Sequence, residues 1–519
     1  MKIAIIGDVA TQLLVRGLDA ALRERGVVAE LWEAPWGQVV RQLTCADSEL
    51  ARFAPDAVVV WESVEHWWER GETAAEHLDS VGKLATAFPG RIYCCNAAPF
   101  DDGLGFAREV RAFNAALDRL EAEHLNFQVV DLAELMARKG REKGFDGTVF
   151  ALADMALVPE LQTLLARRLA ASIAADAGKV RKCVVTDCDG TLWGGIAAEL
   201  GPDGVEYGDT PQGRSHARYQ QWLKRLQRQG VLLAIDSKNE PETVDAVFAA
   251  RPEMVLKRDD FVACQVNWNP KPANLDAIAK QLNLALDAFV FLDDREEQRR
   301  EMRAVHPEVC VPELPPDPAE WVEFLAALDL FPSVRRTTPE DQMRTAMYRE
   351  AQAREAAKAE YVDEASYLAS LESEMSAVPV DGARLARVVQ LIQRTNQFNL
   401  RTQRHSEAEV LQMAAGEGNV ALAFKLKDRF GDFGLVSVLL AERRDESTLF
   451  IDTWVMSCRV IGRRLERFAM DELVRTAKDK GVSRIVGEYL STPRNALVKD
   501  LYAQLGFAKM EDGTWLLQI

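Results

Sequence analysis

The sequence predicts a multidomain α/β protein, and three observations support this fold class. The chain has 519 residues. At roughly 100–200 residues per domain, that length corresponds to about three domains. Two long stretches alternate short apolar runs with helical periodicities, which is typical of parallel sheets covered by helices. The last stretch contains several strand-like runs around one long helix, which indicates an α+β domain.

The composition is that of an ordinary folded chain and excludes several protein classes. Apolar residues make up 48% and charged residues 28%, so disorder, collagen and coiled coil are poor descriptions. Lys and Arg total 63 and Asp and Glu total 80, giving a net charge of −17. This balance argues against general binding of nucleic acid, although a local basic patch stays compatible with it. No apolar stretch reaches the ~18 residues of a membrane span, and the first one is too short for a signal peptide. The eight cysteines lack zinc spacing, and we expect a cytoplasmic protein with reduced thiols.

The first predicted domain covers residues 1–178. Four apolar runs predict its strands: Lys2–Gly7, Asp56–Trp61, Arg91–Asn96 and Phe127–Asp131. Helical periodicity predicts helices at Leu13–Arg25, Phe106–His124 and Leu161–Ala175, before Gly178 ends the domain.

The second predicted domain covers residues 179–335 and alternates in the same way. Its expected strands are Cys183–Thr186, Val231–Ile235 and Ala288–Leu292, with short apolar segments at Met254–Leu256 and Val309–Pro312. Its expected helices are His216–Gln229, Pro241–Ala249, Asn274–Leu282 and Ala319–Leu328.

Residues 336–377 are rich in Ala, Glu, Arg and Lys, and we expect them to be mostly helical, as a linker or a packed insert. The third predicted domain covers residues 378–519. Its expected strands are Val420–Lys425, Gly434–Ala441, Leu449–Val455, Arg484–Tyr489 and Trp515–Gln518. Its expected helices are Gly462–Lys480 and Asn495–Leu505.

Two aspartates directly follow the strand Cys183–Thr186, in Asp187-Cys188-Asp189-Gly190-Thr191. At the carboxyl end of a buried strand, both side chains can project into one crevice. One carboxylate can attack phosphorus while the other exchanges a proton with the leaving oxygen. Alone, such a motif also fits an ordinary turn.

Three further polar elements follow the acid pair along the chain. Ser237, after the strand Val231–Ile235, can donate its hydroxyl to a phosphoryl oxygen, and Lys271 can neutralise phosphoryl charge. Asp293 and Asp294 follow the strand Ala288–Leu292 and offer the hard oxygen ligands that Mg²⁺ prefers. Each of these residues alone could simply lie at a solvated strand end. Because all of them occur in this order along the chain, we favour a phosphoryl-transfer site.

This order resembles the haloacid dehalogenase superfamily of phosphohydrolases, whose catalytic domain is Rossmann-like. The resemblance implies that Asp187 is the nucleophile and Asp189 the general acid and base. It implies that Ser237 and Lys271 hold the phosphoryl group. It also implies that Mg²⁺ is bound by Asp187, the backbone carbonyl of Asp189, Asp293 and Asp294.

A narrower resemblance is to the FkbH-like branch, subfamily IIIC, and it rests on Trp193-Gly194-Gly195 after the acid motif. Three downstream segments are similar to signatures of that family: Arg394-Thr395-Asn396-Gln397-Phe398-Asn399-Leu400, Asp428-Arg429-Phe430-Gly431-Asp432 and Ser457-Cys458-Arg459-Val460. The family is associated with loading a glyceryl unit from 1,3-bisphosphoglycerate onto an acyl carrier protein in polyketide-type biosynthesis, and with removing phosphate. Residues implied at the phosphate or substrate are Gly190, Thr191, Trp193, Lys238, Asn239, Asn396 and Arg429.

Three positions depart from the pattern of this family. Asp236 stands where a Cys is common before Ser-Lys-Asn, and Arg295-Glu296 replaces the usual Asn-Pro. Gly190 stands where Asn is usual. The core phosphatase chemistry is compatible with all three changes, but the first two put the identity of the substrate in doubt.

The N-terminal domain is similar to the degenerate SGNH-like, flavodoxin-like domain of long family members. Val9 follows Gly7-Asp8 where a nucleophilic Ser would stand, and the segment Asp146–Val149 has no His at the Asp-x-x-His spacing. We therefore expect a scaffold or binding surface. Its tryptophans Trp61, Trp67 and Trp68, with His66, fit either a cleft or core packing, and we favour packing.

The C-terminal domain resembles the GNAT acyltransferase fold, which implies a phosphopantetheine arm as ligand, on either coenzyme A or a carrier protein. Arg459–Arg464 partly matches the pyrophosphate-binding loop, and Asn495 with Tyr502 matches the later pantetheine-side motif. Because residues 382–406 contain no acidic side chain, we expect their arginines to meet an acidic carrier protein. Residues assigned to the carrier or its arm are Arg394, Arg401, Arg404, Arg459, Gly462, Arg463, Asn495 and Tyr502. The alternative is that some of the arginines pair internally with Asp428 or Asp432.

Cys458 is our candidate for an acyl thioester, since Arg459, Arg463 and Arg464 favour a thiolate there. Cys188, between the catalytic carboxylates, should have a raised thiol pKa instead. Simple packing of Cys458 stays an alternative.

Three functions remain open from the sequence. The leading one is a Mg²⁺-dependent enzyme that removes phosphate from a three-carbon donor and transfers the acyl unit to a carrier thiol. The others are a phosphatase of a free metabolite and a non-catalytic scaffold that binds a carrier protein. We expect no nucleic-acid or membrane partner.

Overall fold

The computed structural model describes residues 1–98, 107–124, 126–332, 350, 354, 357, 361, 363–492 and 494–519. Within these ranges, the side chains of residues 141, 364, 365, 394 and 458 are left undescribed. The chain divides into two compact units, Met1–Thr337 and Thr338–Ile519. In the described part of the chain, no helix has both the length and the apolar character of a membrane span.

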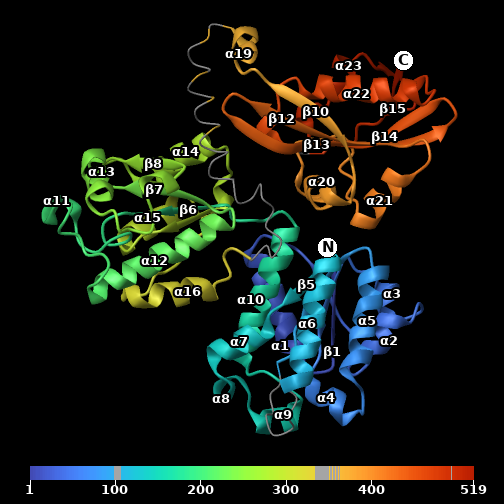
Figure 1. The fold of residues 1–519 in the computed structure, drawn as a ribbon. Helices are drawn as coiled ribbons and strands as arrows, with labels where there is room; N and C mark the ends of the chain where they lie inside the picture. Colours follow the sequence, from blue (N-terminus) through green and yellow to red (C-terminus); the bar gives the residue numbers. More distant parts are fainter. Residues whose placement is uncertain are drawn as a thin grey trace. The chain divides into compact units, whose positions relative to one another are not determined.

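The first unit begins with a five-stranded parallel sheet in the order β2-β1-β3-β4-β5. Helices pack around this sheet (Figure 1). Its strands are β1 (Lys2–Gly7), β2 (Glu30–Glu33), β3 (Ala57–Trp61), β4 (Arg91–Cys95) and β5 (Phe127–Val130). Four of the five confirm the predicted strands. The sequence did not reveal β2, because it is a four-residue edge strand that carries Glu at both ends.

Two helical layers cover this sheet because alternate residues of each strand face opposite sides. Ile3 and Ile5 share one core with α1 (Gln12–Glu24) and α10 (Pro159–Asp176), whereas Ala4 and Ile6 share the other with α5 (Ala74–Ala87) and α6 (Ala107–Glu123). The shorter helices are α2 (Val39–Thr44), α3 (Glu49–Phe53), α4 (Val64–Glu69), α7 (Leu132–Lys139), α8 (Arg141–Gly144) and α9 (Gly147–Ala153).

A second parallel sheet of the same unit has the order β8-β7-β6-β9. Its strands are β6 (Cys183–Thr186), β7 (Leu232–Ser237), β8 (Ala263–Val266) and β9 (Phe289–Leu292). Its helices are α11 (Ala197–Leu200), α12 (Pro211–Arg228), α13 (Pro241–Ala250), α14 (Lys271–Leu282), α15 (Glu296–Val305) and α16 (Trp321–Ala327). The buried run Met254–Leu256 forms no strand. It precedes a short 3₁₀ turn, and β8 follows that turn.

The second unit is an α+β structure around one sheet, with the order β10-β12-β13-β14-β15-β17-β16. Its strands are β10 (Glu374–Pro379), β11 (Phe398–Asn399), β12 (Val420–Asp428), β13 (Gly431–Asp445), β14 (Thr448–Met456), β15 (Arg484–Gly487), β16 (Ala508–Lys509) and β17 (Trp515–Gln518). Its helices are α19 (Glu364–Ser370), α20 (Gly382–Arg394), α21 (Glu407–Ala415), α22 (Leu465–Asp479) and α23 (Leu501–Gln504). Neighbouring strands are antiparallel except β14 and β15, which pair in parallel.

Two predictions for this unit need correction. Met375 lies in β10, not in a helix, because Glu374–Pro379 pairs with β12 and belongs to the sheet. The predicted helix Asn495–Leu505 is interrupted: a 3₁₀ turn at Ala496–Val498 precedes α23. Most of residues 336–361, predicted as helical, lie outside the described residues, whereas α19 agrees with that prediction.

Candidate active site

The predicted phosphoryl-transfer residues meet at the carboxyl edge of the second parallel sheet. Asp187 follows β6, Ser237 ends the neighbouring strand β7, and Asp293 follows β9 on the other side of β6. Lys271 begins α14 after β8. Because parallel strands end at one edge, residues far apart in the chain are brought together there.

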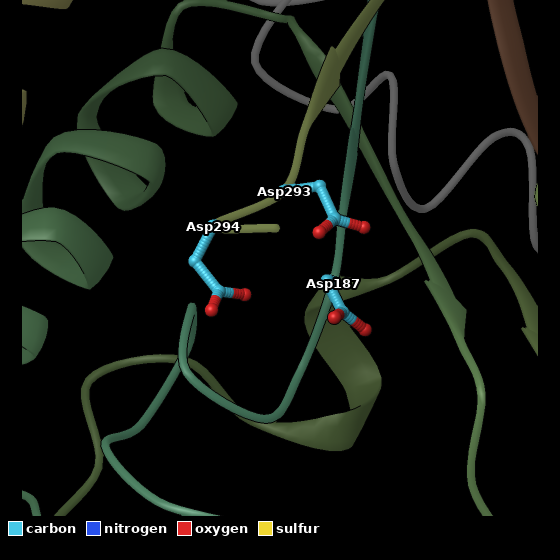
Figure 2. Close-up of side chains that lie close together, drawn as sticks. All are labelled: Asp187, Asp293 and Asp294. Carbon is cyan, nitrogen blue, oxygen red and sulfur yellow. The ribbon is translucent and has the colours of Figure 1, made fainter. Parts of the chain in front are cut away.

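Three carboxylates of this set face a common space (Figure 2). One oxygen each from Asp187, Asp293 and Asp294 lies within 4.8 Å of the other two. The Oδ1 atom of Asp187 is buried, and the ammonium group of Lys271 lies 3.0 Å from it. The three clustered carboxylates exceed this one positive charge, and carboxylate oxygens are the ligands that Mg²⁺ prefers. The donor set therefore fits a hard divalent cation.

Lys271 supplies the positive charge inside this site. Its Nζ atom lies 3.0 Å from Oδ1 of Asp187 and 2.5 Å from Oδ2 of Asp293, and its side chain is almost completely buried. Burial alone would lower the pKa of the Lys271 ammonium, but the carboxylates of Asp187 and Asp293 raise it above its usual value. Burial and the Asp187 charge raise the pKa of Asp293 to about 6, against the opposing effect of Lys271.

Asp189 is held by three donors from two loops. Its Oδ1 accepts from Trp193 Nε1 at 2.8 Å and from the Ala197 amide at 3.1 Å, and its Oδ2 accepts from Asn239 Nδ2 at 2.9 Å. Burial nevertheless raises the pKa of this carboxyl. An oriented carboxyl with a raised pKa suits a general acid. Trp193 and Asn239 thus position Asp189, a role the sequence did not reveal, while their predicted contact with substrate stays a prediction.

The structure explains why residue 190 is a glycine. Its φ is +72°, and a Cβ atom there would lie 2.5 Å from Oδ2 of Asp294. Thr191 next to it donates its hydroxyl to Oδ1 of Asp294 at 3.0 Å. The loop after β6 therefore packs directly against one of the predicted metal ligands, and a side chain at position 190 would displace it.

Arg299 is a site residue that sequence reasoning missed. Its Nη1 donates to the backbone carbonyls of Asp293 at 2.8 Å and Asp294 at 2.7 Å, and its guanidinium also pairs with Glu313. It fixes the loop that carries two of the predicted metal ligands. In the sequence, only its position shortly after Asp293 and Asp294 could have suggested this role.

Asp236, which replaces the family Cys, is fully buried beside the site. Its Oδ1 accepts from Asn274 Nδ2 at 2.9 Å, and its Oδ2 has no hydrogen-bond partner. Burial raises its pKa to about 7, although the Lys271 charge opposes this. Cys188 is also fully buried, and burial followed by the Asp187 charge raises its thiol pKa, as predicted.

Among the arginines predicted to meet a carrier protein, those whose side chains the structure describes have partners within the second unit. Arg401 pairs with Asp452 at 2.5 Å and with Glu488 at 2.8 Å. Arg463 pairs with Asp428 at 2.9 Å, which confirms the internal alternative for this residue. Arg404 donates to the side chain of Asn396 and to backbone carbonyls. Arg459 donates to Ser457 Oγ at 3.2 Å. The guanidinium of Arg429, a predicted substrate residue, lies over the ring of Phe430. Gly462, also predicted at the carrier arm, has a backbone φ of +78°.

The two residues of the predicted pantetheine motif are buried. Asn495 donates to the carbonyls of Asn399 at 2.8 Å and Leu490 at 2.9 Å, and its oxygen accepts from the Thr492 amide. Tyr502 packs on Phe507 and Trp515. Their roles as arm ligands stay predictions, as do those of Ser237 and Lys238 at the phosphate. The side chains of Arg394 and Cys458 lie outside the described residues.

The first sheet carries its own polar cluster, which the sequence did not reveal. His66 Nε2 lies 2.9 Å from Oδ1 of Asp154, and Asp8 accepts from Arg70 at 2.9 Å and from the Ser63 amide at 2.7 Å. Burial and the Glu62 charge raise the pKa of Asp8. Trp61 and Trp67 are buried, as the packing interpretation predicts, whereas Trp68 is exposed.

The first unit has recognisable relatives. The family model described as FkbH, N-terminal domain, matches residues 2–173. The crystal structure of the N-terminal part of the protein BF1531 from Bacteroides fragilis, which contains a phosphatase domain complexed with Mg, is 32% identical. The similarity covers 64% of this chain and 93% of that one, with a TM-score of 0.61.

Other solved structures match a smaller share of the chain. The ribosomal-protein-S18-alanine N-acetyltransferase from Escherichia coli is 17% identical over 28% of this chain and 94% of its own, with a TM-score of 0.22. The GNAT domain of PAT from S. lividans is 13% identical over 28% of this chain and 89% of its own, with a TM-score of 0.23. No curated protein matches the chain.

Proposed function

This chain belongs to the FkbH-like family of the haloacid dehalogenase superfamily. From that premise we propose that it is a Mg²⁺-dependent phosphatase. Its proposed substrate is a phosphorylated three-carbon acyl group that is destined for a carrier protein. The observation that carries the proposal is the buried Asp187 facing Asp293 and Asp294, with the Lys271 ammonium paired to both Asp187 and Asp293.

The residues of the site divide the reaction into two steps. An oxygen of Asp187 attacks phosphorus, the bond from phosphorus to the ester oxygen breaks, and Asp189 gives that oxygen its proton. Asp189 then takes a proton from water, whose oxygen attacks the aspartyl-phosphate and regenerates Asp187 with release of phosphate. Lys271 and Ser237 stabilise the charge on the phosphoryl oxygens throughout.

Mg²⁺ would be held by Asp187, Asp293 and Asp294, with the backbone carbonyl of Asp189 as a further ligand. When bound, it supplies positive charge that brings the anionic substrate next to an anionic nucleophile. Arg299 and Thr191 keep the loops of Asp293 and Asp294 in place for it.

The acyl donor that we propose is 1,3-bisphosphoglycerate, because it carries two different phosphates. A carrier thiol attacks the acyl phosphate, giving a thioester and one phosphate. Water then cleaves the remaining phosphate ester at the site of Asp187, giving a glyceryl thioester and a second phosphate. The intact catalytic set argues against a purely scaffolding role, and a phosphatase of a free metabolite is the remaining alternative.

For the other domains we propose the finer fold assignments. The order β2-β1-β3-β4-β5 is that of a flavodoxin-like sheet, which supports an SGNH-like origin without a serine triad. The second sheet is Rossmann-like. In the second unit, the antiparallel strands β12 to β14 followed by α22 and the parallel neighbour β15 support a GNAT-like domain. We place it as the part that binds an acyl carrier protein through its phosphopantetheine arm, in the cytoplasm.

Phosphate release measured with and without Mg²⁺ tests the proposed function. Asp187→Asn should abolish release from a simple phosphate ester, since the amide keeps the shape of the side chain but cannot attack. Asp209→Asn, at an exposed aspartate of the same unit, is the matched control and should stay active. Full activity in EDTA, or turnover by Asp187→Asn at the wild-type rate, would contradict the assignment.

A further inference from the structure

The carboxyl edge of the first parallel sheet carries buried charged side chains that the phosphatase chemistry does not use. Asp8 follows β1 and Glu62 follows β3, and β1 lies between β2 and β3 in the sheet. In parallel sheets, ligands bind outside the carboxyl ends of the strands at such a switch in strand order. His66, in α4, and Asp154, directly after α9, contact each other at this edge, where the two helices lie side by side (Figure 1).

His66 has a fixed orientation and one ring nitrogen without a partner. Its Nε2 atom lies 2.9 Å from Oδ1 of Asp154, and Oδ2 of Asp154 accepts from Trp36 Nε1 at 2.6 Å. The backbone carbonyl of Asp154 accepts from the Ala10 amide at 2.9 Å, which joins this loop to the loop of Asp8. His66 is only 7% exposed, and its Nδ1 atom is buried without a hydrogen-bond partner. This Nδ1 atom lies 4.0 Å from Oδ1 of Asp8.

His66 and Asp8 together can hold one water molecule. Because the Asp154 carboxylate accepts the Nε2 hydrogen of His66, the neutral imidazole carries a lone pair on Nδ1. Asp8 is fully buried and is held by the Ser63 amide at 2.7 Å and by Arg70 at 2.9 Å. A water oxygen about 2.8 Å from both Nδ1 and Oδ1 fits across their separation and can donate a hydrogen to each. An imidazole oriented by a carboxylate and hydrogen-bonded to water is the arrangement of a general base.

The charges around this place disfavour a phosphate. Arg70 pairs with Asp8 and also with Glu72 at 2.8 Å. His77 lies between two carboxylates, 2.8 Å from Glu62 and 3.0 Å from Glu72. These positive groups are already offset by carboxylates, so an anionic phosphate would be repelled, whereas an uncharged carbonyl compound would not.

Water is the nucleophile that this place can supply. Val9 stands directly after Asp8, where a serine hydroxyl is absent. The hydroxyl of Ser63 donates to Glu65 at 3.0 Å and accepts from the backbone amide of His66 at 3.4 Å. It is therefore engaged in capping α4 and is not aligned with the His66 imidazole.

The His66–Asp154 pair lies close to the protein surface. The side chain of Asp154 is 27% exposed. Trp36 is 63% exposed and lies edge-on to the imidazole, with 6.3 Å between the ring centroids. Phe150 stacks on the imidazole with a centroid distance of 5.4 Å. Aromatic rings beside the base suit an apolar acyl or alkyl group of a substrate.

We propose that the first sheet carries a second catalytic site, in which His66, oriented by Asp154, takes a proton from a water held between His66 and Asp8, and this water hydrolyses an uncharged carboxylic ester. The water oxygen bonds to the acyl carbon, and the bond from that carbon to the alcohol oxygen breaks. His66 passes the proton to the departing alcohol oxygen. The products are a carboxylic acid and an alcohol, and the reaction is separate from the proposed phosphatase function.

The test measures hydrolysis of p-nitrophenyl acetate and p-nitrophenyl butyrate by the full chain in EDTA, which suppresses the Mg²⁺-dependent phosphatase. Wild type should hydrolyse at least one ester with saturation kinetics. His66→Gln should lower kcat/KM at least about 100-fold, the lower end of what a general base contributes. Asp154→Asn keeps the size but loses the orienting charge, and should lower kcat/KM at least about tenfold. The matched control is His124→Gln, a partly buried histidine of the same domain, which should stay within about twofold of wild type.

A second readout separates a catalytic role from a structural one. With Mg²⁺ present, His66→Gln and Asp154→Asn should release phosphate from a simple phosphate ester within about twofold of the wild-type rate. If His66→Gln fails to fold, Asp154→Asn still tests the proposal, since its side chain is partly exposed.

Three results would overturn the proposal. The first is ester hydrolysis by wild type no faster than in buffer alone. The second is equal ester hydrolysis by wild type and by a folded His66→Gln or Asp154→Asn variant. The third is an equal loss in His124→Gln, which would indicate hydrolysis by histidines in general.

Discussion

The hydrogen bond from Trp193 to Asp189 offers a direct test of how the general acid is positioned. The change is Trp193→Phe, which keeps an aromatic ring in the buried pocket and removes the Nε1 donor that lies 2.8 Å from Oδ1. The Ala197 amide and Asn239 still hold the carboxyl. The variant therefore probes one donor of three and leaves the fold in place.

The structure sets the size and direction of the effect. A hydrogen bond to a charged group contributes roughly 1.5–3 kcal/mol, and about 1.4 kcal/mol corresponds to a factor of ten. The indole stabilises the carboxylate that forms as Asp189 gives up its proton, so kcat/KM should fall by at most roughly 10- to 150-fold. Burial already raises the pKa of Asp189, and the Trp193 donor opposes that rise. Without it the pKa climbs further, so the alkaline limb of the kcat/KM profile should move to higher pH.

The assay is phosphate release from a simple ester across pH, with unfolding measured in parallel. Trp321→Phe is the matched control, since Trp321 belongs to the same core and its indole donates at 2.7 Å to the Pro315 carbonyl, a neutral acceptor away from Asp189. Both variants should lose stability within the common range of about 0.5–3 kcal/mol, but only Trp193→Phe should lose activity and shift the profile. An unchanged profile, or an equal loss of activity in Trp321→Phe, would refute the reasoning.

Four other predictions can be tested separately. Mg²⁺ should raise the melting temperature of wild type but not of Asp293→Asn, because a ligand that binds only the folded state stabilises it. The hydrogen bond from His405 lowers the pKa of Asp452 from 3.8 to about 2, although burial opposes this. Asp452 should therefore stabilise the fold above about pH 4, and this stability should be lost as the pH falls through about 2. Asp452→Asn should lack this stability at pH 7, measured by denaturant unfolding. Charge reversal at Arg394, or at the exposed Arg467, should slow association with an acidic carrier protein, and the effect should weaken as salt is added. Hydrolysis of a simple phosphate ester should persist. Arg401→Glu is a poor probe, because it also breaks the ion pairs with Asp452 and Glu488. If the acyl group passes through a thioester on Cys458 before it reaches the carrier thiol, Cys458→Ser and Cys458→Ala should abolish a donor-dependent mass increase of the enzyme; carrier loading by the Ala variant without any trapped adduct would favour the direct transfer proposed above.

The sequence was sufficient for the catalytic acids but not for the groups that hold them. Asp187, Ser237 and Asp293 could be placed because each follows a short apolar run, and parallel strands end at a common edge. The partners of Asp189 could not, because the Trp193 indole and the Asn239 amide reach it only after two loops close around it. Arg299 was hidden for a similar reason: its contacts are backbone carbonyls, which carry no sequence signal.

In the second unit, the distribution of charge along the sequence did not predict which arginines form ion pairs. The stretch 382–406 lacks acidic residues in sequence, so its arginines looked unpaired. The fold brings Asp452, in β14, and Glu488, directly after β15, to Arg401 from far along the chain. Long-range ion pairs of this kind depend on sheet order, and neither periodicity nor composition encodes that order.

The balance of charge in the catalytic site ties these observations together. Asp187, Asp293 and Asp294 lie close together, and the Lys271 ammonium pairs with the first two, so this cluster holds more negative than positive charge. Such an excess is tolerated in a buried place only if a proton or a cation offsets it. Burial and the Asp187 charge raise the pKa of Asp293, and a divalent cation beside it would oppose that rise. Asp236, with its pKa near 7 and one unpartnered oxygen, adds a carboxyl that can stay neutral beside Lys271. The replacement of a Cys by this Asp therefore need not add a further negative charge to the site, which explains physically how the substitution is compatible with phosphatase chemistry.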